Sequence, residues 1–136
     1  VFGDSLSREG DEPAGEGDSE VSWDIDVRSF ETHARVEHYV TYFSGAARER
    51  IADRLGRGTR YEPMIRAKFR AAGIPEDMYY LALIESGFDN HAYSRAAAVG
   101  MWQFMSSTAR GMGMRVDWWI DERRDPVAST EGATKF

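Results

Sequence analysis

The chain has no cysteine, and its 136 residues include only four prolines and three histidines. Without cysteine it can form neither disulfides nor thiolate metal sites, and the redox compartment stays undetermined. His33, His38 and His91 do not have the spacing of metal ligands, so no metal site is expected. No run of about 18 apolar residues is present, so no membrane-spanning helix is expected.

A basic run is also missing, and the excess of negative charge lies at one end. Residues 1–20 contain seven acids and one base, a net charge of −6 that equals the formal net charge of the whole chain. With four glycines, one proline and few apolar residues, this stretch is predicted to be a disordered acidic tail. Residues 21–136 are therefore neutral overall, which argues against nucleic acid as a partner.

Residues 21–72 are predicted to form a helical lead-in, with helices over 29–43, 46–55 and 61–72. Apolar residues recur at helical spacing in these stretches, and glycines follow each of them. Nothing in this region points to a particular chemistry.

The segment 75–85 predicts a helix with apolar residues on nearly all sides. Pro75 suits the first turn, and Gly87 can take the left-handed conformation that ends a helix. Glu85 falls on an apolar stripe, so burial and the helix dipole are expected to raise its pKa, as in a general acid. The alternatives are a Glu85 that turns to solvent or one that pairs with Arg95 or Arg110, and periodicity alone leaves them open.

The part after Gly87 combines loops with two short helices. A compact apolar segment, residues 100–105, precedes a helix that starts at 106–108, and Asp125-Pro126 starts another. Trp118 and Trp119 are predicted to pack in the core. The chain ends at 136 with an apolar helix face that lacks a partner and begins without Met, so we expect a fragment that is truncated at its C-terminus.

Several short strings occur in a fixed order and at a specific spacing. They are Ala82-Leu83-Ile84-Glu85-Ser86-Gly87-Phe88, Ser94-Arg95, Gly100-Met101-Trp102-Gln103-Phe104-Met105, Thr108-Ala109 and Asp121-Glu122-Arg123-Arg124-Asp125-Pro126-Val127-Ala128. Together they resemble the soluble-type (SLT) lytic transglycosylase domain, and within that family most of all its membrane-bound branch. The resemblance covers residues 23–136.

The resemblance implies a mainly α, lysozyme-like α+β fold, with residues 73–136 as the N-terminal part of an incomplete SLT domain. Such domains cleave the β-1,4 bond between N-acetylmuramic acid (MurNAc) and N-acetylglucosamine (GlcNAc) in peptidoglycan without water, leaving 1,6-anhydro ends. Glu85 matches the catalytic acid and base. Ser94 matches a residue that binds the muramoyl N-acetyl region, and Gln103 matches an amide that holds the sugar. Further candidates for substrate binding are Ser86, Met101 and Trp102, with Phe104 beside them. As alternatives, Ser86 only caps the helix end, the three apolar residues pack in the core, and Gln103 is a core amide that bridges backbone groups.

The resemblance also sets expectations for cofactors, partners and location. No cofactor or metal is expected, and the partner is the glycan strand of peptidoglycan. A monomer is expected in the periplasm or at the outer membrane, with any lipid anchor outside this chain. Two departures stand out: a later Ala-Tyr-Asn-type motif has no counterpart, and Ser106 stands where many relatives have proline.

Two alternative functions remain beside the transglycosylase. A muramidase, which is a peptidoglycan hydrolase, normally needs a second carboxylate, and Asp89 is the nearest candidate in the sequence. A catalytically silent peptidoglycan-binding module would retain Glu85 on its apolar stripe only at a cost in stability.

Overall fold

The computed structural model describes residues 32–136. The acidic tail predicted for residues 1–20 lies outside this range. The elements are α1 (Ala34–Ser44), α2 (Arg48–Gly58), α3 (Glu62–Ala71), a 3-10 turn over Glu76–Met78, α4 (Tyr79–Glu85), α5 (Ser106–Gly111), a 3-10 turn over Glu122–Arg124, and α6 (Pro126–Ala133). Strand structure in the described part is limited to three isolated bridges. The expected mainly α fold is therefore confirmed.

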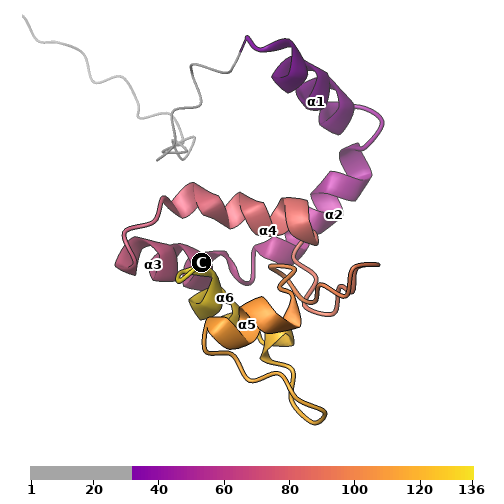
Figure 1. Ribbon diagram of the computed structural model, residues 1–136. Helices are drawn as coiled ribbons and strands as arrows, with labels where there is room; N and C mark the ends of the chain where they lie inside the picture. The colour runs from indigo at the N-terminus through magenta and orange to yellow at the C-terminus, as the bar shows by residue number, and fades with distance from the viewer. Residues whose placement is uncertain (1–31) are drawn as a thin grey trace, which may run out of the picture.

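The first helix stands apart from the other elements. α1 contains no buried residue and is followed by α2, which leads into the body of the domain (Figure 1). Both observed helices begin later than predicted. His33, whose ring nitrogen accepts a hydrogen bond from the backbone N–H of Arg35, is the N-cap of α1.

The core forms where α3 and α4 meet the loops that follow them. Ile65 and Phe69 of α3 pack with Tyr79 and Ala82 of α4 in one buried cluster, which Phe88 joins from the loop after α4. The rings of Tyr79 and Phe88 lie 4.6 Å apart between centroids. This packing holds the C-terminal end of α4, where Glu85 lies, against the loop that follows.

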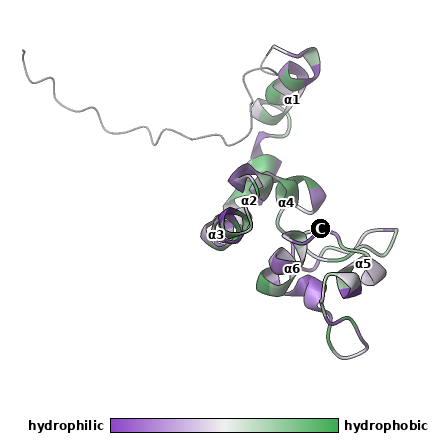
Figure 2. Cartoon of the chain, turned by 60° about the vertical axis from the view of Figure 1, so that its left-hand side comes forward, coloured by the Kyte–Doolittle hydropathy of each residue, from purple (hydrophilic) through white to green (hydrophobic). Residues whose placement is uncertain are grey.

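The helix predicted over 75–85 differs from the one observed. Pro75 has an extended conformation (ψ 128°) and precedes a 3-10 turn, so the α-helix proper begins only at Tyr79. Ile84 is 78% exposed and Leu81 is 38% exposed, so α4 is buried on one side only. Figure 2 shows α4 as largely hydrophobic nonetheless. The prediction of a helix buried all round is wrong, because no other element covers this second face in the described part of the chain.

A buried arginine ties the loop over residues 93–104 to the segment before α6. Arg123 is only 6% exposed, and its guanidinium donates to the carbonyl of Phe104 (3.2 Å). Gly100 approaches the same backbone so closely that a Cβ there would lie 1.8 Å from the carbonyl oxygen of Arg123. The loop can therefore pack this way only with glycine at position 100.

The aromatic pair predicted to lie in the core is at the surface instead. Trp118 and Trp119 are 91% and 84% exposed. They lie in a turn in which the carboxylate of Asp117 accepts the backbone N–H groups of Trp119 (2.8 Å) and Ile120 (2.9 Å). The core prediction for both tryptophans is wrong, because this turn directs them away from the helices.

The ion pair of Asp121 and Arg123 predicts a specific pH dependence of stability. Two hydrogen bonds of 2.8 Å join the side chains, and these bonds, aided by the arginine's charge, hold the pKa of Asp121 below its ordinary value of 3.8. Because the folded-state pKa is the lower one, the stabilisation is complete above the unfolded-state pKa and is lost as pH falls through the folded-state value.

Replacing Asp121 by asparagine should therefore lower the free energy of unfolding by about 3 kcal/mol at pH 7, since the buried guanidinium loses its counter-charge. The difference between the variant and the parent should shrink as pH falls from about 5 to 2. Urea unfolding at a series of pH values measures it. A difference that stays constant down to pH 2 would contradict this role for the pair.

Candidate active site

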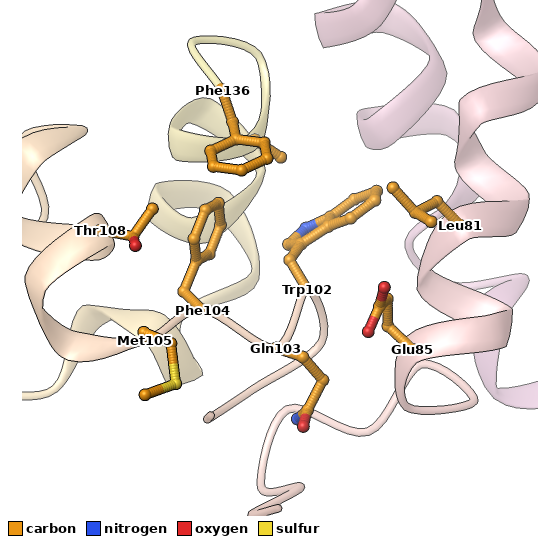
Figure 3. A pocket seen from close by; sticks show the side chains of 9 residues that line it. Leu81, Glu85, Trp102, Gln103, Phe104, Met105, Thr108 and Phe136 are labelled. Atoms are coloured by element: carbon orange, nitrogen blue, oxygen red, sulfur yellow. The ribbon is translucent and has the colours of Figure 1, made fainter. Parts of the chain in front are cut away.

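A cavity of about 280 Å³ opens between α4, the loop over residues 101–105, α5 and the C-terminal end. Figure 3 shows Glu85 projecting from the last position of α4 toward Trp102, with Phe104, Thr108 and Phe136 on the other side. The residues that line it are Leu81, Glu85, Trp102, Gln103, Phe104, Met105, Thr108, Ala133 and Phe136. Glu85 is the only acidic side chain among them. The site thus presents one acid to an otherwise mainly apolar hollow.

Glu85 is exposed, as in the solvent-facing alternative that the sequence left open, and the burial expected for its carboxylate is wrong. The ion pairs among residues 32–136 do not include Glu85, and Arg110 instead donates from two nitrogens to the carbonyl of Val116 (3.0 and 2.9 Å). The carboxylate is therefore open to a ligand in the cavity and is not held by either arginine considered from the sequence.

Gln103 is held in an uncommon conformation beside Glu85. Its φ is +54°, in the left-handed region that residues other than glycine rarely adopt. Its side-chain N–H₂ donates to the carbonyl of Gly100 (2.9 Å) and more weakly to that of Ala92 (3.4 Å). The amide thus bridges the backbone of its own loop, and these bonds fix its orientation at the cavity wall.

Ser86 and Trp102 both connect elements around the cavity. The Ser86 hydroxyl donates to the carbonyl of Met101 (2.8 Å) and accepts from the backbone N–H of Asp89 (3.1 Å). The indole N–H of Trp102 donates to the hydroxyl of Thr130 on α6 (3.1 Å), and its ring meets the ring of Phe69 edge to face, with centroids 5.4 Å apart. Ser86 therefore joins α4 to the loop that carries Gln103, while Trp102 also forms part of the cavity wall.

Three predicted substrate-binding residues, Ser86, Ser94 and Met101, do not line this cavity. Met101 is fully buried in the core, which leaves its side chain no surface for a ligand. Ser94 lies in a turn where its hydroxyl accepts the backbone N–H of Ala98 (3.0 Å). The structure thus brings together Glu85, Gln103, Trp102 and Phe104, but gives Met101 a packing role.

Sequence reasoning missed five of the lining residues: Leu81, Met105, Thr108, Ala133 and Phe136. Leu81 could have been found, because it precedes Glu85 by four residues and so shares its helix face. The others come from α5, α6 and the C-terminal end, whose approach to α4 depends on tertiary packing alone.

Asp89, the candidate second carboxylate of a hydrolase, lines a different cavity of about 360 Å³ with Arg57, Arg60 and Asn90. It is thus separated from the cavity of Glu85. Within residues 32–136 no group of acidic and histidine side chains is arranged to hold a metal ion, and none of the helices there is long and apolar enough to cross a membrane.

A mainly helical domain with one acid at a helix end, facing a cavity, has the arrangement expected of the lysozyme-like class of domains. The chain belongs to the transglycosylase SLT domain family, whose family model matches residues 62–136. This match confirms the family inferred from the motifs. It begins within α3, upstream of residue 73, and the domain boundary stays a prediction.

The relatives agree with this assignment. Over 77 residues the chain is 39% identical to membrane-bound lytic murein transglycosylase D of two Escherichia coli strains, K12 and O6:H1, covering 57% of this chain and 17% of each relative. An Alteromonas protein named for tributyltin chloride resistance is 35% identical over 63 residues, which are 46% of this chain and 30% of that protein. The chain thus spans less than a fifth of the length of the E. coli relatives.

Proposed function

We propose that this domain cleaves the β-1,4 bond between MurNAc and GlcNAc in peptidoglycan without water and leaves 1,6-anhydroMurNAc ends. The observation that carries the proposal is that Glu85 is the only acidic side chain lining its cavity. A reaction whose nucleophile belongs to the substrate needs no second carboxylate. Membership of the SLT family supports the same reaction class.

In the proposed mechanism Glu85 acts twice. Its carboxyl group first donates a proton to the glycosidic oxygen as the bond from that oxygen to C1 of MurNAc breaks. The resulting carboxylate then takes the proton of the C6 hydroxyl as O6 bonds to C1, which returns Glu85 to its acid form. Leu81, Trp102 and Phe104 form apolar walls around a bound sugar and exclude the water that would compete with O6.

The neighbouring residues take binding and positioning roles in this proposal. The side-chain oxygen of Gln103 accepts a hydrogen bond from the sugar, because its N–H₂ group is already bound to the loop backbone. Trp102 offers its ring, since its N–H is used by Thr130. From the family resemblance we propose that Ser94, which lies outside the cavity lining, binds the N-acetyl region of a glycan that extends beyond the cavity. Ser86 holds α4 and the Gln103 loop together. We propose no substrate contact for Met101.

Two rival functions are less well supported. A muramidase would need a second carboxylate about 5–5.5 Å or about 6.5–9.5 Å from the first, and Asp89 lies in the other cavity. A silent binding module gives no reason for a single acid in an apolar cavity. We further propose that the full-length protein works as a monomer in the periplasm or at the outer membrane, with any lipid anchor outside this chain.

Product analysis tests the proposal. Purified peptidoglycan treated with this chain should release fragments whose MurNAc ends are lighter by one water than hydrolysis products and resist reduction by borohydride. Mass spectrometry before and after borohydride treatment measures both properties. Fragments that gain two hydrogens on reduction would identify a hydrolase instead.

A further inference from the structure

The second cavity, of about 360 Å³, is lined by the loop that follows Glu85 and by the C-terminal end of α2. Its polar lining consists of Arg57, Arg60, Tyr61, Asp89, Asn90 and His91. α2 and the residues just after it supply the arginines, and the loop after α4 supplies Asp89, Asn90 and His91. The proposed reaction uses none of these residues.

The two arginines of this cavity, Arg57 and Arg60, have guanidinium groups that are not neutralised by an ion pair within residues 32–136. Arg57 uses only its Nε, which donates to the carbonyl of Gly87 (3.1 Å), and Arg60 lies over the ring of Tyr61 at 5.9 Å. The remaining guanidinium N–H groups can bind a carboxylate through charge-assisted hydrogen bonds.

The loop side of the same cavity offers two acceptors, the side-chain oxygens of Asn90 and Asp89. The side-chain oxygen of Asn90 is buried without a hydrogen-bond partner, while its N–H₂ group donates to the hydroxyl of Tyr61 (2.8 Å). Beside it, Asp89 accepts the backbone N–H of His91 (2.8 Å) and makes no ion pair in the described part of the chain. A buried acceptor without a donor is costly, so this wall suits a ligand that brings N–H groups.

We propose that this cavity binds the zwitterionic end of an amino acid. The ligand's carboxylate faces Arg57 and Arg60, and its ammonium group faces Asp89 and Asn90. The negative charge of Asp89 disfavours a multiply charged anion such as phosphate, which offers no N–H donor in return.

If the proposed function holds, the substrate supplies this amino acid. The identity of the ligand therefore rests on the proposed function. Peptide stems extend from the MurNAc units of a glycan strand, and an uncrosslinked stem carries free amino and carboxylate groups. Only residues 86–88 separate Glu85 in the first cavity from Asp89 in the second. One strand can thus place its sugar in the first cavity and its stem in the second, which would make this domain selective for strands that bear uncrosslinked stems.

A titration with a sugar-free stem peptide tests the site without any cleavage. The probe is a short peptide with a residue whose free ammonium and carboxylate groups are on the same carbon, added to the 136-residue chain and followed by calorimetry. Arg60→Gln should weaken binding about tenfold, the loss expected for one charge-assisted contact. Arg48→Gln is the matched control, because Arg48 is exposed on α2, outside the lining, and loses the same charge. Blocking the peptide's amino group by acetylation should weaken binding as well.

Three results would overturn the site: no saturable binding, equal losses in the two arginine variants, or inorganic phosphate that competes as well as the peptide. Cleavage of peptide-free glycan, measured in parallel, keeps the two proposals apart. Normal cleavage without peptide binding would refute only the amino-acid site. Peptide binding without cleavage would instead refute the enzyme and, with it, the assignment of the ligand to a glycan stem.

Discussion

Replacing Glu85 by glutamine should lower the rate of anhydro-end formation by about 10²–10⁴-fold, the usual contribution of a general acid–base residue. The amide cannot give up a proton to the glycosidic oxygen or take one from the C6 hydroxyl. Because Glu85 is exposed and outside the described ion pairs, the substitution leaves no buried group unpaired. The urea midpoint and the binding of insoluble peptidoglycan in a sedimentation assay should both stay unchanged.

Glu37→Gln is the matched control for this experiment. Glu37 is an exposed acid on α1, away from the cavity, and its loss should leave the rate of cleavage unchanged. Glu85→Gln that retains more than a tenth of the parental rate would refute the assignment of Glu85 as the acid. A parent chain that binds glycan and never cleaves it would instead be a binding module.

Replacing Gly100 by alanine should produce the largest loss of stability. The new Cβ would lie 1.8 Å from the carbonyl oxygen of Arg123 and 2.8 Å from its carbonyl carbon, and both are backbone atoms that cannot rotate away. The φ of Gly100 is also +84°, which alanine rarely adopts. We expect a loss of about 3–5 kcal/mol in the free energy of unfolding.

Gly111→Ala serves as the control, because a Cβ at that position at the end of α5 meets nothing within 4 Å. Urea unfolding followed by tryptophan fluorescence compares the two variants. Gly100→Ala should also lose cleavage activity, because the carbonyl of Gly100 holds the side chain of Gln103. Equal midpoints for the two variants would contradict the close packing of the loop against Arg123.

Local signals predicted some helix ends correctly, although the start expected at Pro75 was wrong. Asp125 accepts the backbone N–H of Ala128 (2.7 Å) at the start of α6, and Gly87 has a φ of +64° after α4, both as their sequence contexts indicate. Capping depends on a few neighbouring residues and can therefore be read locally. Burial of Glu85 and of Trp118 was predicted wrongly, because apolar spacing does not reveal whether another element covers that face.

Only the site residues that belong to the family's sequence motifs could be predicted. Glu85 and Gln103 are 18 positions apart in the sequence, and the family resemblance rather than any spacing rule brought them together. Two contacts could not be predicted from residue spacing. They are the hydrogen bond from Arg123 to the Phe104 carbonyl and the close approach of Gly100 to the backbone of Arg123. The second cavity could not be predicted from the sequence either, because its arginines and its acid come from helices and loops that meet only in the folded chain.

Cleavage in oxygen-18-labelled water tests the central claim most directly. If the C6 hydroxyl of MurNAc is the nucleophile and Glu85 its base, purified peptidoglycan should yield anhydroMurNAc ends that contain no label by mass spectrometry. One labelled oxygen at C1 of the new MurNAc ends would show that water attacks, and the domain would then be a hydrolase with a second catalytic group still to be found.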